Sequence, residues 1–397
     1  MDGVSLETWV VHGGERRPEL VETPTVGPVH FSTTYTRGSA AEMDAILGGE
    51  TPGFTYGRHG NPTVAALADT LAVMEQGDGA LLYASGMAAL QGALLSCGLK
   101  AGDEILVSRD LYGATAALVR QVFGGFGIVP RFIDMTDTAA VMTALTKGKM
   151  RAIVLETISN PLLRVIDFPA ILAEAKLREV PSIVDNTFAT PYLCQPLTVG
   201  ADMVVHSTTK YLNGHGDVMG GVVVTRQDRL KEMEAQQKLT GGIMSPMDAW
   251  LTQRGLKTFA LRFVRQLTSA EELARRLQDH PQVERVYHPS LSDHPDYARA
   301  VELLPLGQGA VVSFIVRGGR QQVYRLMEAL RLVVPGTTVG DVYSLMLYPV
   351  MASHRSLSPE ERAAAGITEG LVRLSVGIEQ VEDIWQDLDQ ALSRSGR

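Results

Sequence analysis

Cysteine is nearly absent from this chain of 397 residues, which contains only Cys97 and Cys194. The two lie far apart and have neither Cys-x-x-Cys nor Cys/His ligand spacing, so neither a disulfide framework nor a zinc site is predicted. The simplest interpretation is two free thiols in a reducing compartment. We expect no metal site.

Long apolar runs and positive charge are also scarce. No stretch approaches the roughly 20 apolar residues that cross a bilayer, and residues 1–10 resemble no signal peptide. The 36 Lys and Arg residues against 44 Asp and Glu give a formal net charge of −8, so neither nucleic acid nor a membrane is expected as a partner. The composition, with 45% hydrophobic residues, is that of a globular protein, which we expect to be cytoplasmic.

The chain divides into three parts by texture. Residues 1–61 are punctuated by Gly and Pro and are predicted to form an irregular arm that contacts a neighbouring subunit. In residues 62–255 short apolar runs alternate with amphipathic stretches, which predicts a mostly parallel sheet with helices on both faces. Residues 256–397 are predicted to form a smaller α+β domain. The strands predicted for the middle part are Gly79–Ala84, Glu104–Val107, Ile128–Phe132, Ala152–Leu155, Ser182–Val184, Met203–Val205 and Gly221–Val224.

Two polar residues follow apolar runs of the predicted sheet. Asp185 comes directly after Ser182–Val184, and Lys210 comes shortly after Met203–Val205, so both are expected at the carboxyl edge, where α/β sheets bind ligands. Alone, such an Asp is more often a cap and such a Lys is more often solvated. Together they supply what pyridoxal 5′-phosphate (PLP) requires, an amine for a Schiff base and a carboxylate for the pyridinium nitrogen.

Two further segments offer donors for a phosphate group. Ser85, Gly86 and Met87 stand at a predicted strand-to-helix turn, where free N–H groups and the helix dipole favour an anion. Ser207 and Thr209 are two residues apart beside the lysine, so both hydroxyls could reach one phosphate. Each feature by itself is common turn chemistry. Their position in this sequence makes a phosphate site the preferred interpretation.

The chain resembles the Cys/Met-metabolism (transsulfuration) family of fold-type I PLP-dependent enzymes. The resemblance covers nearly the whole chain, and as a set its motifs are highly specific. It implies the α/β fold of the fold-type I PLP-dependent transferases, with a large, mostly parallel sheet domain and a smaller C-terminal α+β domain. The matching segments, in the family order, are Tyr56–Thr63, Ser85–Ala89, Asp110–Gly113, Glu156–Pro161, Val184–Thr187, His206–Tyr211 and Leu371–Gly377.

The resemblance also implies roles for individual residues. Lys210 would form the Schiff base and move protons, Tyr112 would stack on the cofactor ring, and Asp185 would pair with the ring nitrogen. The residues implied to hold the cofactor are Tyr56, Arg58, Ser85, Gly86, Met87, Tyr112, Asp185, Ser207, Thr209 and Lys210. Those implied to bind the substrate are Asn160, Thr338 and Arg373, with Arg373 on the α-carboxylate. Tyr56 and Arg58 would serve the site of a neighbouring subunit, in a homotetramer built as a dimer of dimers.

Local features favour the methionine γ-lyases within the family. The segments Lys210–Asp217 and Lys238–Pro246 resemble the form common in those enzymes. Cystathionine-specific members usually have a glutamate at the position of Thr337, and a threonine cannot pair with the far ammonium group of cystathionine. Ala114 and Leu239 depart from the methionine γ-lyase pattern, which has a cysteine and an aspartate there.

We therefore expect a PLP-dependent carbon–sulfur lyase that converts L-methionine or homocysteine to 2-oxobutanoate, ammonia and a thiol by γ-elimination. A cystathionine γ-lyase and a γ-replacement enzyme (cystathionine γ-synthase or O-acylhomoserine sulfhydrylase) stay open as alternatives. A nucleotide-binding oxidoreductase is disfavoured because Gly214, Gly216 and Gly220 have the wrong spacing for a dinucleotide loop. A catalytically silent relative is disfavoured because Lys210 and Asp185 are both present.

Overall fold

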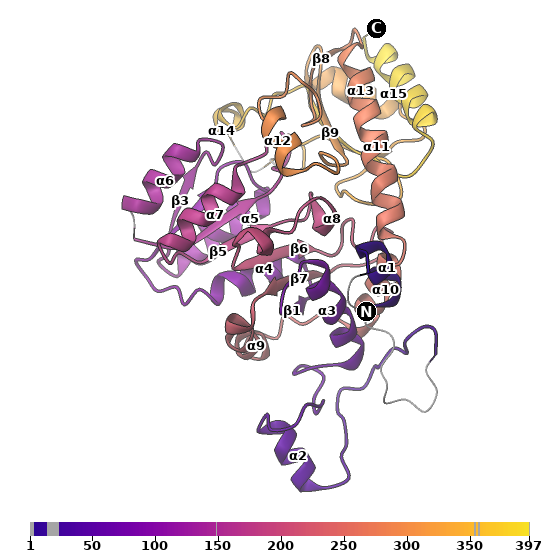
Figure 1. Cartoon of the computed structure of the whole chain (residues 1–397). Coiled ribbons are helices and arrows are strands. Elements are labelled where there is room, and N and C mark those ends of the chain that lie inside the picture. Colours follow the sequence, from indigo (N-terminus) through magenta and orange to yellow (C-terminus); the bar gives the residue numbers. More distant parts are fainter. Residues whose placement is uncertain (1–3, 14–23, 148, 353–354, 356–357, 397) are drawn as a thin grey trace.

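The computed structural model describes residues 4–13, 24–147, 149–352, 355 and 358–396. Two sheets organise these residues (Figure 1). The larger has seven strands in the order β1-β7-β6-β5-β4-β2-β3, and the smaller has five in the order β10-β11-β12-β9-β8. This architecture confirms the α/β fold expected from the sequence, with a large sheet domain and a smaller C-terminal one.

The large sheet is parallel from β6 to β3, and β7 lies antiparallel between β6 and β1. Every apolar run predicted as a strand matches one of its strands to within two residues at either end. The strands are β1 (Gly79–Tyr83), β2 (Glu104–Ser108), β3 (Val129–Ile133), β4 (Met150–Glu156), β5 (Ser182–Asp185), β6 (Met203–Ser207) and β7 (Gly221–Thr225).

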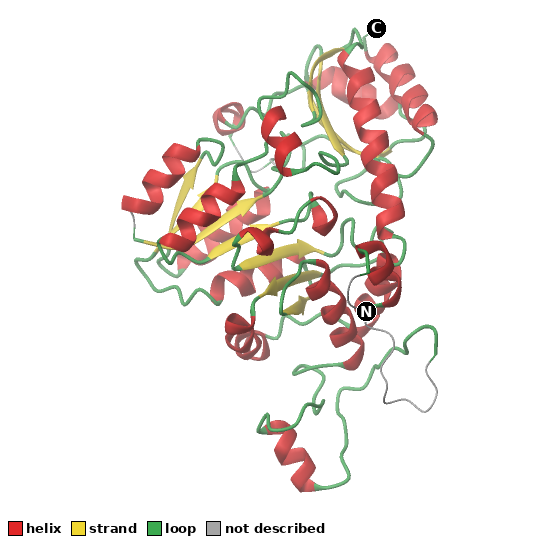
Figure 2. Ribbon diagram, viewed as in Figure 1, coloured by secondary structure: helices red, strands yellow, loops and turns green. Residues whose placement is uncertain are grey.

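Both faces of this sheet are buried. Successive residues of a strand point to opposite sides of the sheet, so one strand contributes to two cores. In β4, Ile153 and Leu155 enter one core, whereas Ala152 and Val154 enter another. Helices close both cores, as the layers in Figure 2 show. The first core takes in α3 (Pro62–Met74), α6 (Thr138–Lys147) and α7 (Phe168–Leu177). The second takes in α4 (Gly86–Leu95), the π-helical turn Leu118–Phe123 that continues α5 (Gly113–Ala117), and α9 (Gln227–Thr240).

One long helix joins the two sheets. In α11 (Phe259–Gln278), Phe259 and Phe263 pack in the core of the large sheet, whereas Leu273 and Leu277 pack in the core of the small one. Only its second half is predicted from the sequence, as Ser269–Leu277, although Phe259, Phe263 and Leu267 recur every four residues along the first half. The other elements beyond the large sheet are α8 (Thr190–Leu193), the 3₁₀ turn Pro196–Val199, α10 (Pro246–Leu256), β8 (Val283–Tyr287), α12 (Tyr297–Leu303), β9 (Val311–Val316), α13 (Arg320–Ala329), β10 (Val334–Pro335), β11 (Leu345–Leu347), α14 (Pro359–Ala364), β12 (Leu371–Ser375) and α15 (Val381–Ser395).

The N-terminal segment contains two helices where only irregular structure was expected. They are α1 (Leu6–His12) and α2 (Ala40–Leu47), and each begins at a serine whose side chain accepts a backbone N–H. Such N-capping serines were the signal that the prediction missed. α1 packs on the large domain through Val10, whereas α2 buries no residue and projects from the body with the arm (Figure 1). The domain limits at residues 61 and 255 stay a prediction.

None of the helices in the described ranges is long and apolar enough to cross a membrane.

Candidate active site

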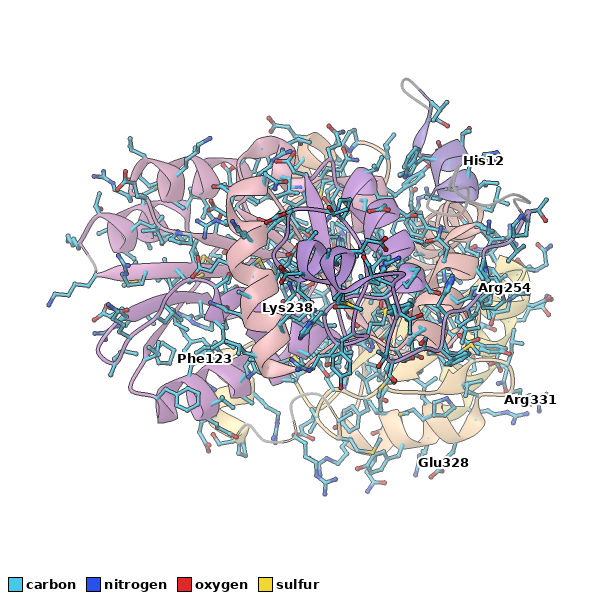
Figure 3. All side chains as sticks on the ribbon, turned by 90° about the horizontal axis from the view of Figure 1, so that it is seen from below. His12, Phe123, Lys238, Arg254, Glu328 and Arg331 are labelled. Atoms are coloured by element: carbon cyan, nitrogen blue, oxygen red, sulfur yellow. The ribbon has the colours of Figure 1, made fainter. Side chains whose placement is uncertain are left out.

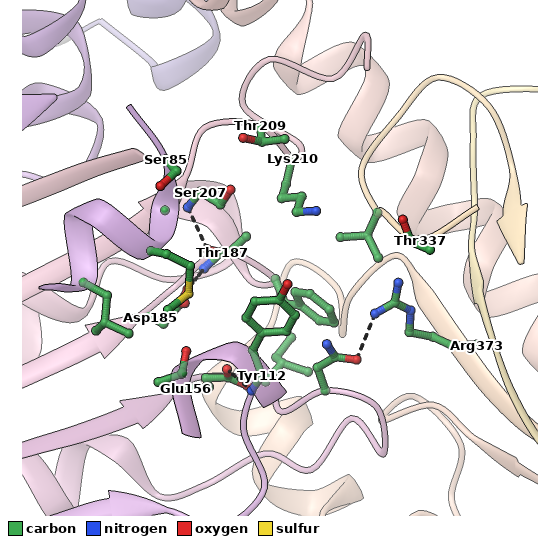
Figure 4. A pocket seen from close by; sticks show the side chains of 18 residues that line it. Ser85, Tyr112, Glu156, Asp185, Thr187, Ser207, Thr209, Lys210, Thr337 and Arg373 are labelled. Atoms are coloured by element: carbon green, nitrogen blue, oxygen red, sulfur yellow. Dashed lines mark hydrogen bonds between the residues drawn. The ribbon is translucent and has the colours of Figure 1, made fainter. Parts of the chain in front are cut away.

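A cavity of about 210 Å³ lies at the carboxyl ends of β4, β5 and β6, where these strands face the small domain (Figure 4). The parallel strands bring their last residues to one edge, and β12 of the small domain closes the other side. Most of the residues predicted for the site line this cavity together: Ser85, Gly86, Met87, Tyr112, Asn160, Asp185, Ser207, Thr209, Lys210 and Arg373.

Lys210 lies in the turn that follows β6, with its amine inside the cavity. Its Nζ donates a hydrogen bond to Thr338 Oγ1 at 2.6 Å. Burial lowers the pKa of Lys210 to about 8, with a further lowering from the charge of Arg373 and an opposing effect of Asp185. An amine with such a pKa has a neutral fraction near pH 7, and that fraction can act as a nucleophile or a base.

Two carboxyl groups lie side by side at the ends of neighbouring strands. Asp185 ends β5 in register with Glu156, which ends β4. The Thr187 N–H donates to Asp185 Oδ1 at 2.9 Å, and the Tyr112 N–H donates to Glu156 Oε1 at 2.8 Å. Burial raises the pKa of Asp185. The pKa of Glu156 is raised well above its ordinary value, first by burial and then by the negative charge of Asp185. The sequence reasoning gave Glu156 no role, although it too ends an apolar run.

The start of α4 forms a polar cradle next to the lysine. Ser85 caps this helix by accepting the N–H of Ala88 at 3.1 Å. A Cβ at Gly86 would lie 2.8 Å from Ser207 Cβ, so only glycine allows the two segments to come so close. The Thr209 hydroxyl lies on the same side and accepts the N–H of Gly220 at 3.0 Å. Backbone N–H groups at a helix start together with serine and threonine hydroxyls suit a phosphate.

Arg373, on β12, is a buried cation that meets no carboxylate among the described residues. Its side chain donates from Nη1 to Asn160 Oδ1 at 3.0 Å and from Nη2 to the Thr338 carbonyl at 3.2 Å, while its buried Nε has no partner. The residue is 3% exposed, and in the described part of the chain no carboxylate forms an ion pair with it. Burial lowers its pKa to about 10. A buried guanidinium in this state calls for an anionic ligand, and a carboxylate matches its planar fork.

Three predicted residues do not line the cavity. Thr338 still contacts it through the hydrogen bond to Lys210. Tyr56 and Arg58 lie elsewhere, with the guanidinium 5.5 Å from the centre of the tyrosine ring. Arg58 also donates to the carbonyl of Lys238, near the end of α9 (Figure 3). Within one chain, these two residues therefore do not take part in the site around Lys210.

Residues 7–393 match the family model described as Cys/Met metabolism PLP-dependent enzyme. The chain belongs to this family. It is 40% identical to the L-methionine gamma-lyase of Pseudomonas deceptionensis, over 92% of each chain, and 38% identical to the cystathionine gamma-lyase of Bacillus subtilis, over 97% of this chain and 98% of the relative. Its fold matches the crystal structure of a cystathionine gamma synthase from Xanthomonas oryzae pv. oryzae with a TM-score of 0.93 and 35% identity, over 99% of both chains.

The protein is thus a PLP-dependent carbon–sulfur lyase of the transsulfuration type, as expected from its motifs. The cavity fits the cofactor because it combines an amine of lowered pKa at Lys210, a buried carboxyl group at Asp185 and the polar cradle at Gly86. Elsewhere in the described ranges, no group of three His, Cys, Asp or Glu side chains is placed to hold a metal ion.

Proposed function

We propose that the enzyme catalyses γ-elimination of L-methionine or homocysteine, which yields 2-oxobutanoate, ammonia and a thiol. The observation that carries this proposal is that Thr337, in the lining of the cavity, carries no charge. This residue lines the cavity together with the apolar side chains of Ile158, Phe188 and Val339. A thioether or thiol at the end of the substrate suits such a wall.

The charged residues of the cavity support the same choice. Among the described residues that line it, the charged ones are Glu156, Asp185, Lys210 and Arg373. We assign Asp185 to the cofactor ring and Arg373 to the α-carboxylate, whereas Glu156 is occupied by backbone N–H groups. No carboxylate is then left to meet the distal ammonium of cystathionine. An unpaired charge in a pocket is unfavourable, so cystathionine should be the poorer substrate.

The proposed roles follow from where each side chain lies. When bound, PLP supplies an electron sink for the carbanion that forms at the substrate α-carbon. Arg373 and Asn160 hold the α-carboxylate, which orients the Cα–H bond. The Lys210 amine removes that proton and carries it onward, since its lowered pKa leaves a lone pair available. Tyr112 would cover the cofactor ring and would assist proton transfer at the departing sulfur, and Asp185 would hold a proton at the ring nitrogen.

Assembly is the second part of the proposal. We propose a homotetramer, a dimer of dimers in which Tyr56 and Arg58 complete the phosphate site of the neighbouring subunit. The arm that carries them exposes apolar side chains, with Phe31 66% and Leu47 63% exposed, and a neighbouring subunit would cover them. Leu239 on α9 is 87% exposed and follows Lys238, whose carbonyl accepts the hydrogen bond from Arg58. Since both cysteines are free thiols, a reducing cytoplasmic location is also proposed.

Product analysis with separate substrates tests the activity. Methionine, homocysteine, cystathionine and an O-acylhomoserine are each supplied to the purified enzyme, with and without an added thiol, and 2-oxobutanoate, ammonia and any new thioether are measured. We expect kcat/KM for methionine or homocysteine to exceed that for cystathionine. Faster cleavage of cystathionine would instead identify a cystathionine γ-lyase. A dominant thioether product from O-acylhomoserine would identify a γ-replacement enzyme.

A further inference from the structure

Glu156 lies inside the cavity and pairs with no cation in the described part of the chain. It ends β4, is 9% exposed, and within the described ranges forms no ion pair. Its carboxyl group instead accepts the Tyr112 N–H at 2.8 Å, and the backbone N–H of Asn160 also faces it and lowers its pKa against the effect of burial. The group therefore meets two backbone donors from two different loops.

Both loops contribute residues to the lining of the cavity. Tyr112 is the N-cap residue of α5, and its side chain makes no capping hydrogen bond. Its ring projects into the cavity (Figure 4). Asn160 follows β4 in the next loop, and its side-chain oxygen accepts a hydrogen bond from Arg373 at 3.0 Å. Glu156 thus connects the ring that covers the cofactor site with the amide that orients the guanidinium.

We propose that Glu156 is a positioning residue that sets the distance between the Tyr112 ring and the carboxylate-binding pair of Asn160 and Arg373. It acts through hydrogen bonds to the two backbones and does not touch the substrate. A short acceptor fixed to the end of a sheet strand is suited to this task, because the strand itself is rigid. The role applies to any α-amino acid substrate and is independent of whether methionine is preferred.

Three substitutions separate the acceptor from the charge. Glu156→Gln keeps a carbonyl oxygen at the same place, whereas Glu156→Ala removes the acceptor and leaves buried N–H groups unpaired. Glu156→Asp keeps the chemistry but withdraws the acceptor by one methylene. The matched control is Asp202→Ala, because Asp202 accepts the Ser182 N–H at 2.8 Å at the opposite end of β5, away from the cavity.

The measurements are made on the PLP-loaded protein. The first is the Kd of 4-(methylthio)butanoate, which lacks the amine; its thioether tail is the same in every measurement, so a difference between variants reports the Asn160–Arg373 side. The second is the visible circular dichroism of the bound cofactor, which reports its contact with Tyr112. For Glu156→Ala we expect a Kd about 10-fold higher, which corresponds to one lost hydrogen bond of about 1.4 kcal/mol, and a weaker visible signal. The Kd of Glu156→Gln should stay within about 3-fold of that of the original enzyme, and its visible signal should be unchanged.

The Kd and the visible signal of Glu156→Asp should fall between those of Glu156→Ala and Glu156→Gln. Asp202→Ala should lower the melting temperature without changing the Kd. If Glu156→Ala does not fold, the aspartate and glutamine variants still give the comparison. An unchanged Kd and visible signal in a folded Glu156→Ala or Glu156→Asp protein would overturn the proposal. So would equal losses in the glutamine and alanine variants, because the charge and not the acceptor would then matter.

Discussion

Replacing Arg373 with lysine should weaken the binding of the α-carboxylate and leave the fold in place. The guanidinium is 3% exposed, contacts no carboxylate in the described part of the chain, and has an unpaired Nε. Its contacts with Asn160 and Thr338 hold it in place without neutralising it. We propose the substrate carboxylate as the anion that would complete its surroundings.

The size of the effect follows from the number of hydrogen bonds that are lost. A guanidinium can bind a carboxylate through two parallel N–H donors, whereas a lysine ammonium at the same place offers one. A hydrogen bond to a charged group contributes about 1.5–3 kcal/mol, so kcat/KM should fall about 10- to 150-fold in Arg373→Lys. Arg373→Met, which loses both bonds and the charge, should fall by about 10²- to 10⁴-fold.

Steady-state kinetics on the preferred substrate measures this loss, with KM and kcat determined separately. Arg262→Lys is the matched control, because burial lowers the pKa of Arg262 to about 10 as well. Its donors, however, are met by the carbonyls of Tyr211, Asn213 and Gly255, so its loss should lower the melting temperature and spare KM. A KM within about 2-fold of the original in Arg373→Lys would refute the assignment of the carboxylate to this guanidinium.

Four further outcomes are expected. Lys210→Ala should lack the visible absorbance of the lysine-bound cofactor and lose activity by orders of magnitude, as measured by spectroscopy and turnover. The rate at which the cofactor-free protein takes up PLP should rise with pH and level off above about 8, because the Lys210 amine becomes neutral there. A midpoint of this pH profile near 10.5 would contradict the lowered pKa of Lys210. Thr337→Glu should raise kcat/KM for cystathionine relative to methionine, and an unchanged ratio would remove Thr337 from the specificity argument. Mixing inactive Arg58→Ala and Lys210→Ala proteins under conditions of subunit exchange should restore activity through hybrid dimers with one intact site, and no recovery would count against a shared site.

The sequence determined the sheet and the position of the pair proposed for catalysis. The inner strands of the large sheet are buried on both faces, so they appear as short apolar runs such as Met203–Val205 that local pattern alone identifies. Asp185 and Lys210 come directly or shortly after such runs, so the local pattern is enough to place both at the carboxyl edge of the sheet. The family motifs then added Arg373 and Asn160, although nothing in the sequence placed them in contact.

Tertiary structure alone decided how these residues meet and what charge they carry. Arg373 and Asn160 are 213 residues apart, and they contact each other only because the small domain folds back over the edge of the large sheet. The role inferred for Glu156 rests on the backbone N–H groups of Tyr112 and Asn160, and the first of these comes from a loop 44 residues away in the chain. Burial is the main cause of the lowered pKa values of Lys210 and Arg373. Burial depends on what the rest of the chain packs around a side chain, which the spacing of residues does not encode.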